Sequence, residues 1–283
     1  MSTAALSPTP ADPARPVRCA VLGSPISHSL SPVLHRAAYA DLGLDWEYAA
    51  HEVGEHELAA FLDGLDETWR GLSLTMPLKR AVLPLLDDID ERASLVGAAN
   101  TVVLGSGRRR VGHNTDVPGA VAAIRERSSE SFGSAVVLGG GATAASLMHA
   151  LADLGCTEIM VVVREESRAA STVAAARRHP QRPKVDVRRF RASLPVTDIL
   201  VSTIPASAQS PEVVALAGSA RLVFDVVYDP WPTPLAEEAL RREATFVSGL
   251  DLLVHQAALQ VALMTGASPP PLAVMRAASE QFR

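Results

Sequence analysis

The stretch Ser134–Leu154, which reads SAVVLGGGATAASLMHALADL, decides the fold. A strand-like apolar run leads into three glycines, and an Ala- and Leu-rich helical segment follows directly. This spacing fits G-x-G-x-x-A between a strand and a helix, the fingerprint of a dinucleotide-binding βαβ unit. We expect Gly139 to permit the tight turn, Gly141 to let a pyrophosphate approach the backbone, and Ala144 to allow close helix–strand packing. The helix N-terminus would offer further amides to the phosphates. A purely structural turn is the alternative.

The strand after the glycine loop indicates which dinucleotide binds. NAD sites usually carry Asp or Glu at its end, whereas here IMVVV ends in Arg164, with Arg168 one helical turn later. Guanidinium groups suit a 2′-phosphate, so we expect NADP rather than NAD. Glu165 and Glu166 lie alongside, and surface ion pairing is the alternative role for the arginines. The candidate cofactor residues of this region are Gly139, Gly140, Gly141, Ala142, Arg164 and Arg168.

Strand-like and helix-like segments alternate on both sides of this stretch. The connections between them are long enough for crossovers, which indicates an α/β fold with mainly parallel sheets. We expect strands near 17–23, 46–53, 71–75, 100–104, 134–140, 158–164, 185–188, 199–202 and 222–226. We expect helices near 32–42, 55–62, 89–95, 143–154, 167–178, 250–265 and 272–282, and another that begins at Pro77.

Length and composition indicate a globular protein. The 283 residues are enough for two domains, 48% are hydrophobic and 20% charged, and the mean hydropathy is +0.16. No stretch approaches the roughly 20 apolar residues that span a bilayer. A net charge of −5 and a pI near 5.9 give no reason to expect a nucleic-acid partner.

The N-terminus and the cysteines favour a cytoplasmic chain. Residues 1–16 lack the basic and apolar regions of a signal peptide, and their four prolines predict a disordered tail. Cys19 and Cys156 are far apart and have no CxxC or His partners, so we expect buried thiols rather than a disulfide or a zinc site. No metal-ligand cluster is evident.

Rare residue types mark positions of interest. Of the 26 basic residues only Lys79 and Lys184 are lysine, and only Asn100 and Asn114 are asparagine. A Lys or Asn retained under such a bias can serve where Arg, Asp or Ser cannot. Three of the four lie in stretches that carry polar groups in apolar settings. These stretches are SPISHSLSP (Ser24–Pro32), SLTMPLK (Ser73–Lys79), GAANT (Gly97–Thr101) and GHNTD (Gly112–Asp116).

These stretches resemble the shikimate dehydrogenase family, whose patterns are close to NPIxHSxSP, NVTxPxK, GAxNT and GxNTD. YDPWPTPL (Tyr228–Leu235) and SGLDLLVHQA (Ser248–Ala257) extend the resemblance, which spans about Val17 to Gln260. It implies a reversible NADPH-dependent reduction of 3-dehydroshikimate to shikimate, a step of aromatic amino-acid (chorismate) biosynthesis. The small molecule would be the partner, with no nucleic acid and no membrane, in a monomer or a homodimer.

The resemblance implies a catalytic pair, Lys79 and Asp116. Hydride transfer to a carbonyl leaves alkoxide charge that needs a proton donor, and an ammonium gives up a proton whereas a guanidinium does not. Asp116 would hold Lys79 and accept from a substrate hydroxyl. The alternatives are an ordinary surface Lys and an N-cap Asp opening the helix near Val117.

Further residues match substrate-binding positions of the family. Ser29 and Ser31 would bind the carboxylate as neutral donors, although an N-cap before Pro32 is an alternative for these serines. Thr75, Asn100 and Gln256 would hydrogen-bond the ring hydroxyls, which discriminates against analogues that lack them. Tyr228 and Gly249 match positions near substrate and nicotinamide, and core packing is the alternative for Tyr228.

Some positions depart from the family patterns. Ser73 stands where Asn is usual, and the glycine loop reads GGGATA rather than GAGGAA. Val163 and Glu165 replace two residues of the usual NRT motif, and Ser202–Pro205 replaces NATS. All but Ser73 lie on the nucleotide side, so these departures bear on the cofactor more than on the substrate.

We therefore expect an N-terminal α/β catalytic domain with a mainly parallel sheet, and a Rossmann-type dinucleotide-binding domain. The catalytic domain would comprise residues 17–114 and 250–283, and the NADP-binding domain residues 115–249. A quinate/shikimate dehydrogenase using NAD, with an aminoshikimate dehydrogenase as a variant of it, is one rival function. A non-catalytic nucleotide-binding homologue is the other, and the retention of both Lys79 and Asp116 argues against it.

Overall fold

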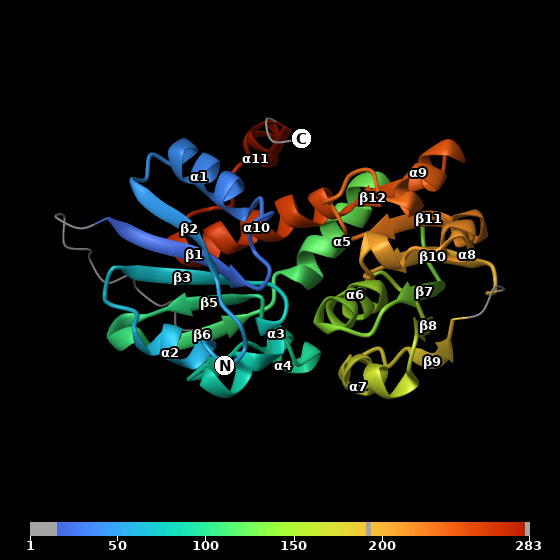
Figure 1. The fold of residues 1–283 in the computed structure, drawn as a ribbon, viewed down its shortest axis with the longest axis horizontal. Coiled ribbons are helices and arrows are strands. Elements are labelled where there is room, and N and C mark those ends of the chain that lie inside the picture. The colour runs from blue at the N-terminus through green and yellow to red at the C-terminus, as the bar shows by residue number, and fades with distance from the viewer. Residues whose placement is uncertain (1–15, 191–193, 281–283) are drawn as a thin grey trace. The chain divides into compact units, whose positions relative to one another are not determined.

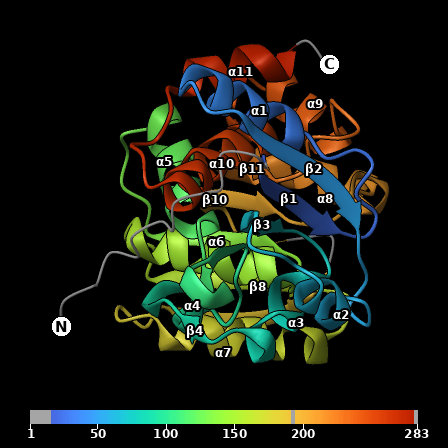
Figure 2. The same cartoon turned by 90° about the vertical axis from the view of Figure 1, so that its left-hand side faces the viewer.

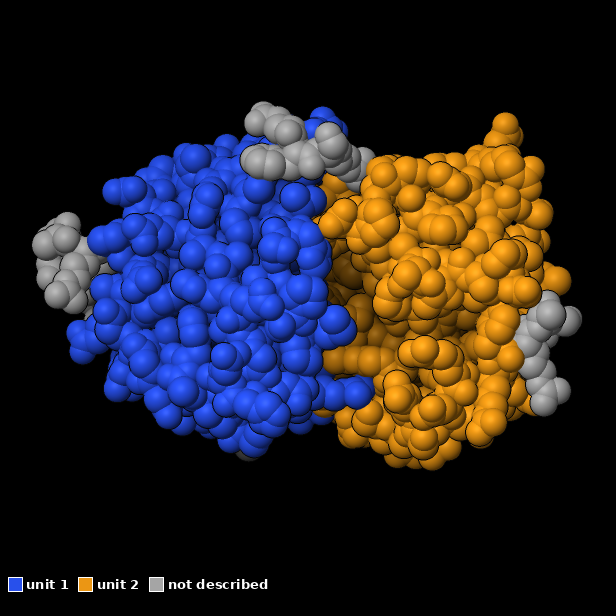
Figure 3. Space-filling model, viewed as in Figure 1, with its two compact units in different colours: residues 1–94, 98–115, 256–283 blue, residues 95–97, 116–255 orange. Residues whose placement is uncertain are grey.

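The computed structural model describes residues 16–190 and 194–280. Two compact units divide the chain and are coloured separately in Figure 3. Unit 1 comprises Met1–Ser94, Ala98–Thr115 and Gln256–Arg283, and unit 2 comprises Leu95–Gly97 and Asp116–His255. The boundaries therefore fall at 115/116 and 255/256, where the sequence led us to expect 114/115 and 249/250. The tail expected over 1–16 lies outside the described residues except for Pro16, as does the end of the helix expected at 272–282.

Unit 1 is built on a six-stranded mixed sheet in the order β2-β1-β3-β5-β6-β4 (Figure 1). The expected parallel pairing holds for β1 with β2 and β3, and for β4 with β6. By contrast, β5 is antiparallel to both β3 and β6, because a short turn joins β5 to β6 without a crossover. The strands are β1 (Val17–Gly23), β2 (Trp46–Glu52), β3 (Trp69–Leu74), β4 (Asp88–Ile89), β5 (Thr101–Leu104) and β6 (Arg110–His113).

Helices pack on this sheet and bury its apolar side chains. Leu22 of β1 and Leu72 of β3 belong to a core cluster that also contains Leu62 and Leu78 from two of the helices. Two helices far apart in sequence, α1 and α11, lie side by side (Figures 1 and 2). The helices of unit 1 are α1 (Ser31–Asp41), α2 (Leu58–Asp63), α3 (Leu78–Ala81), most of α4 (Glu91–Val96), the C-terminal part of α10 (Gly249–Thr265) and α11 (Leu272–Glu280).

Unit 2 has the doubly wound order of a dinucleotide-binding fold. Its six strands are all parallel, in the order β12-β11-β10-β7-β8-β9, and the winding direction reverses between β7 and β10. Ligands of such sheets bind beyond the carboxyl ends of the strands at this reversal. The strands are β7 (Ser134–Leu138), β8 (Glu158–Val163), β9 (Lys184–Arg189), β10 (Thr197–Ser202), β11 (Ala220–Asp225) and β12 (Thr245–Ser248). The helices are α5 (Asp116–Arg127), α6 (Ala142–Asp153), α7 (Ala170–Arg178), α8 (Pro211–Ala215), α9 (Pro234–Arg241) and the start of α10.

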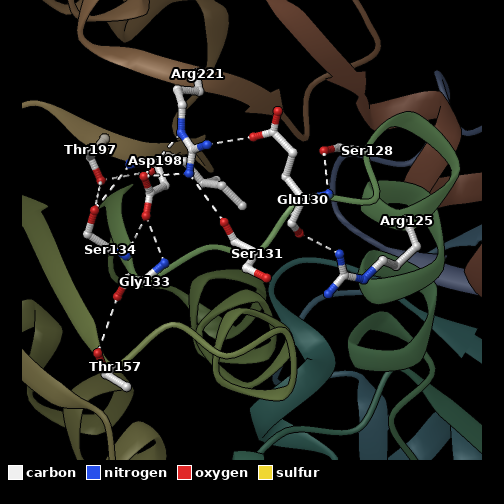
Figure 4. A network of polar contacts seen from close by, with 11 residues as sticks. Arg125, Ser128, Glu130, Ser131, Gly133, Ser134, Thr157, Thr197, Asp198 and Arg221 are labelled. Carbon is white, nitrogen blue, oxygen red and sulfur yellow. Dashed lines mark hydrogen bonds and ion pairs between the residues drawn. The ribbon is translucent and has the colours of Figure 1, made fainter.

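A polar network ties together the opposite, amino-terminal edge of this sheet (Figure 4). Arg221 at the start of β11 pairs with Asp198 of β10 at 2.7 Å and with Glu130 at 2.6 Å. The other oxygen of Asp198 accepts hydrogen bonds from the backbone N–H groups of Gly133 and Ser134, at 2.7 and 3.0 Å. The network holds three neighbouring strands at their starts, so the loops at their far ends begin from fixed positions.

The two cysteines are buried free thiols, which confirms the expectation from their surroundings. Burial raises the pKa of Cys19 to about 11 and that of Cys156 to about 12, so both stay protonated at neutral pH. Within the described part of the chain, no helix combines the length and apolar character needed to cross a bilayer.

Candidate functional site

The glycine loop follows β7 at the winding reversal of unit 2. Gly139 has φ of +111°, a conformation that L side chains rarely adopt, and a Cβ there would lie 2.3 Å from Thr203 Oγ1. Its N–H donates to the Val162 carbonyl at 2.9 Å. The turn therefore requires glycine at position 139, as the spacing predicted.

The protein surroundings of Gly141 do not require glycine at this position. It is the N-cap residue of α6, which begins at Ala142, and a Cβ at Gly141 would meet no protein atom within 4 Å. Thr172 of α7 fixes the loop from behind by donating to the carbonyls of Gly140 and Gly141, at 2.6 and 3.2 Å. Open space beside a fixed backbone at a helix N-terminus is the arrangement that accommodates a pyrophosphate.

A pocket of about 530 Å³ opens beside this loop. Both expected cofactor arginines lie in it, Arg164 directly after β8 and Arg168 in the following 3₁₀ turn. They are the only charged side chains among the described residues that line the pocket, and no carboxylate faces them across it. Glu165 instead accepts a hydrogen bond from Arg168 Nε at 3.2 Å, in an exposed pair. The positive lining suits an anion, and an NAD-type ribose carboxylate is absent from it.

The pocket also contains Phe190, which the sequence did not single out, and part of the 202–205 stretch that departs from the family pattern. Phe190 follows the edge strand β9, and Thr203 and Ile204 follow β10. Thr203 Oγ1 occupies the space that a Cβ on Gly139 would need. The remaining lining is mostly apolar: Leu138, Val162, Val163, Pro205, Ala208, Ser210 and Val213.

In unit 1, the expected substrate residues Thr75 and Asn100 lie at neighbouring strand ends of the sheet. Gly23 ends β1, and a Cβ on it would lie 2.3 Å from Thr75 Cγ2, so the two strand ends approach closely. Thr75 N donates to the Leu22 carbonyl at 2.9 Å, and Leu74 N donates to the Asn100 carbonyl at 2.7 Å. Because β5 runs antiparallel to β3, Asn100 before β5 lies beside Thr75 after β3.

Ser29 and Ser31 lie in the loop that leads from β1 into α1. Ser31 N donates to Ser29 Oγ at 3.3 Å, and Ser31 is the buried first residue of α1. The N-cap position is occupied by Leu30 without a side-chain cap bond, so the capping alternative for these serines is wrong. His35 lies one turn further, with Nδ1 2.9 Å from the Ser31 carbonyl oxygen.

Lys79 lies in the short helix α3, half-buried. Its carbonyl accepts a hydrogen bond from Ala99 N at 2.8 Å, which ties α3 to the segment that carries Asn100. Asp116 is buried and is the first residue of α5 in unit 2, one residue after Thr115 of unit 1. The pairing of Lys79 with Asp116 stays a prediction.

Asn100 and Gln256, which are 156 residues apart in sequence, are brought together. Asn100 Nδ2 donates to Gln256 Oε1 at 3.2 Å, and both side chains are almost fully buried. Thr115 N donates to Asn100 Oδ1 at 2.8 Å. Thr115, the last residue of the second segment of unit 1, is thus anchored to Asn100, and Asp116 follows it directly in the chain.

Tyr228 and Gly249 both lie in unit 2. Tyr228 is half-buried in the loop after β11. Asp225 starts this loop and accepts from Thr233 Oγ1 at 2.7 Å, and its burial raises the pKa of its carboxyl group. Gly249 begins α10, where a Cβ would lie 2.1 Å from the Val226 carbonyl oxygen. Close backbone packing therefore requires glycine at 249, and its cofactor role stays a prediction.

No group of three or more His, Cys, Asp or Glu side chains in the described ranges is placed to hold a metal ion. The structure thus presents two sets of groups for organic ligands. One is the arginine-lined pocket at the glycine loop, and the other is the buried hydroxyl and amide set of unit 1.

Comparison with known proteins identifies the family. Residues 21–102 match the shikimate dehydrogenase substrate binding domain, and residues 249–278 match the shikimate 5′-dehydrogenase C-terminal domain. A shikimate dehydrogenase (NADP(+)) of Synechococcus sp. is 34% identical, covering 92% of this chain and 93% of that protein. The crystal structure of Mycobacterium tuberculosis shikimate dehydrogenase is similar with a TM-score of 0.83 and 38% identity, covering 94% of this chain and 100% of that one. A quinate dehydrogenase of Corynebacterium glutamicum in complex with NAD has the same TM-score at 27% identity, covering 94% of this chain and 99% of that one. The chain therefore belongs to the shikimate dehydrogenase family.

Proposed function

We propose that the protein catalyses the reversible NADPH-dependent reduction of 3-dehydroshikimate to shikimate in aromatic amino-acid biosynthesis. Two observations support this proposal beyond family membership. Among the described residues, the pocket beside the glycine loop is lined by two arginines and no carboxylate, while the buried amides and hydroxyls of unit 1 suit a polyhydroxylated substrate. The first feature favours NADP over NAD, and the second favours a substrate rich in hydroxyl groups.

NADP fits the residues present in unit 2. The backbone of Gly140 and Gly141, with open space beside Gly141, would hold the pyrophosphate, and Arg164 and Arg168 would pair with the 2′-phosphate. Phe190 offers an aromatic surface for the adenine in the same pocket. When bound, the nicotinamide supplies or takes up the hydride.

Lys79 serves as the proton donor in the direction of ketone reduction. The carbonyl oxygen gains negative charge as the hydride reaches the carbon, and the Lys79 ammonium can pass a proton to that oxygen. Asp116 holds the ammonium and accepts a hydrogen bond from a substrate hydroxyl. Its burial at the start of α5 restricts its position, and the helix N-terminus favours its negative charge.

The remaining residues bind and orient the substrate. Ser29 and Ser31 donate to the carboxylate without placing a permanent charge beside it. The ring hydroxyls are held by Thr75, Asn100 and Gln256, which share one edge of unit 1. Tyr228, Gly249 and Ala142 complete the proposed set, the first two near substrate and nicotinamide and Ala142 at the start of α6.

The division of labour follows the two domains expected from the sequence, whose bounds lie close to those of units 1 and 2. We assign substrate binding to residues 17–114 with 250–283, and NADP binding to residues 115–249. We further propose that the protein acts in the cytoplasm as a monomer or homodimer.

A matrix of steady-state kinetics tests the function. Shikimate and quinate are each oxidised with NADP and with NAD, and kcat/KM is compared for the four combinations. We expect shikimate with NADP to exceed the other three by at least tenfold. A preference for NAD or quinate would assign the protein to the quinate dehydrogenase type, and no turnover in any combination would reject the enzyme assignment.

A further inference from the structure

Ser73 lies in β3 at the position where the family pattern has Asn, and its hydroxyl is engaged on two sides. Tyr48 Oη is 2.6 Å from Ser73 Oγ, and Gln260 Oε1 is 2.8 Å from it. All three side chains are at most 3% exposed. The Ser73 hydroxyl is therefore bonded within the core of unit 1, between β2 and α10.

Backbone groups fix the direction of these hydrogen bonds. Gln260 Nε2 is 3.1 Å from the Asn100 carbonyl oxygen and 3.0 Å from Thr101 Oγ1. A carbonyl only accepts, so this end of the Gln260 amide is the NH₂ group and the end at Ser73 is oxygen. Ser73 must then donate to Gln260, and Tyr48 must donate to Ser73.

The same reasoning orients Asn100. Thr115 N lies 2.8 Å from Asn100 Oδ1, and a backbone N–H only donates, so this atom is the amide oxygen. Thr101 Oγ1, which accepts from Gln260, also donates to this oxygen, at 2.9 Å. Asn100 Nδ2 consequently faces Gln256 Oε1. The Oε1 end of the Gln256 amide is thereby engaged within unit 1, so a substrate hydroxyl that meets this amide would meet its nitrogen end.

Four side chains in this series do not belong to the expected substrate set, and we call them the Ser73 network: Tyr48, Ser73, Gln260 and Thr101. We infer that the Ser73 network positions the substrate by holding the amides of Asn100 and Gln256 in place, through the bonds of Gln260 and Thr101 to Asn100. The inference rests on the proposed function, because a ring hydroxyl is the group that senses the position of these amides. An amide that shifts from this position no longer directs its polar atoms at the hydroxyl, which loses a hydrogen bond.

Removing the Ser73 hydroxyl tests the inference. In Ser73→Ala the buried Gln260 Oε1 loses the hydroxyl that donates to it, so the Gln260 side chain can move and weaken its bonds to Asn100 and Thr101. We expect the KM for shikimate to rise about tenfold, while the KM for NADP and kcat change less than twofold. Tyr48→Phe keeps the bond from Ser73 to Gln260 and removes only the outer donor, so we expect a rise of about threefold with little risk to folding.

Tyr39→Phe is the matched control. Tyr39 is a second fully buried tyrosine of unit 1, and its hydroxyl lies 4.0 Å from Met264 Sδ, outside the Ser73 network. We expect Tyr39→Phe to shift the urea unfolding midpoint about as much as Tyr48→Phe does, and to leave the KM for shikimate unchanged. A merely structural role of Ser73 would lower kcat through inactive molecules and spare KM.

The outcomes separate this inference from the proposed function. An active wild type, with Ser73→Ala and Tyr48→Phe both within twofold of its shikimate KM, overturns the Ser73 network and leaves the function standing. An equal rise of the KM for NADP also overturns it, because the effect is then not specific to the substrate. A wild type that neither binds shikimate in calorimetry nor oxidises it rejects the function itself.

Discussion

His35 makes the stability of unit 1 sensitive to mild acid. Its side chain is fully buried in α1, its ring stacks on Tyr48 with centroids 3.9 Å apart, and its Nδ1 is held by the Ser31 carbonyl. Because the carbonyl accepts, Nδ1 carries the proton, and Nε2 is buried without a hydrogen-bond partner. Protonation would place a charge at Nε2 with nothing to stabilise it. Burial accordingly lowers the pKa of His35 to about 4.

The magnitude follows from the two protonation states. In the unfolded chain His35 titrates near its ordinary pKa of about 6.5, so between pH 6.5 and pH 4 the unfolded state binds the proton and the folded state does not. Stability is therefore lost as the pH falls through this window. Between pH 7 and pH 5 the loss from His35 alone is about 2 kcal/mol.

His35→Gln isolates this contribution. Glutamine keeps an N–H donor for the Ser31 carbonyl but does not titrate. Urea unfolding is followed by tryptophan fluorescence in a Trp231→Phe background, which leaves Trp46 and Trp69, both in unit 1, as reporters. The stability advantage of wild type over the variant should shrink by about 2 kcal/mol between pH 7 and pH 5. His28→Gln, at an exposed position of the same unit, is measured in parallel as the control for the His-to-Gln substitution itself.

A constant difference between wild type and His35→Gln across pH 5 to pH 7 would refute the reasoning. It would mean that the folded protein accepts a proton at His35 about as readily as the unfolded chain. The buried, unpartnered Nε2 would then have to gain a partner on protonation.

Three further predictions concern the proposed active site. Lys79→Ala should lower kcat by orders of magnitude and leave the Kd for NADP in calorimetry within twofold, whereas unchanged turnover would remove Lys79 from the catalytic role. Arg164→Ala and Arg168→Ala should each raise the KM for NADP about tenfold or more and leave the KM for NAD unchanged, and an equal effect on both cofactors would contradict the 2′-phosphate assignment. Gly249→Ala places a Cβ 2.1 Å from a backbone oxygen and should destabilise the protein by about 3 kcal/mol in urea unfolding. Gly141→Ala meets no protein atom within 4 Å, so it should preserve stability and weaken NADP binding; equal destabilisation by the two alanines would refute this contrast.

The glycine loop was predictable from the sequence because its determinants are local. The tight turn at Gly139, the open position at Gly141 and the start of α6 all follow from a pattern within a dozen residues. The arginines after β8 were found in the same way, since β8 follows the loop's helix directly. Each of these features can be inferred from the strand–turn–helix pattern of the local sequence alone.

Features that depend on long-range contacts were not predictable. Phe190 lines the nucleotide pocket only because β9 lies at the edge of the sheet beyond β8. The strand β5 was expected, but its antiparallel direction was not, and β6 was missed because it is short and carries basic residues. The two hydrogen-bond partners of Ser73 are 25 and 187 residues away in sequence. The sequence therefore showed that Ser73 departs from the family pattern, but it did not show which side chains Ser73 contacts. The orientation of an Asn or Gln side-chain amide can be assigned only from the positions of nearby backbone groups, and a sequence pattern does not give these positions.

The division of unit 1 into separate stretches of sequence has a consequence for synthesis. Unit 2 is nearly continuous, from Asp116 to His255, so all its described strands precede Gln256 and Gln260 in the order of synthesis. Asn100 is made early, but the partners that α10 brings are among the last residues of the chain. A chain that stops at His255 would hold the residues of unit 2 and lack the α10 partners of Asn100, so it would have the groups for nucleotide binding without the complete set for substrate recognition.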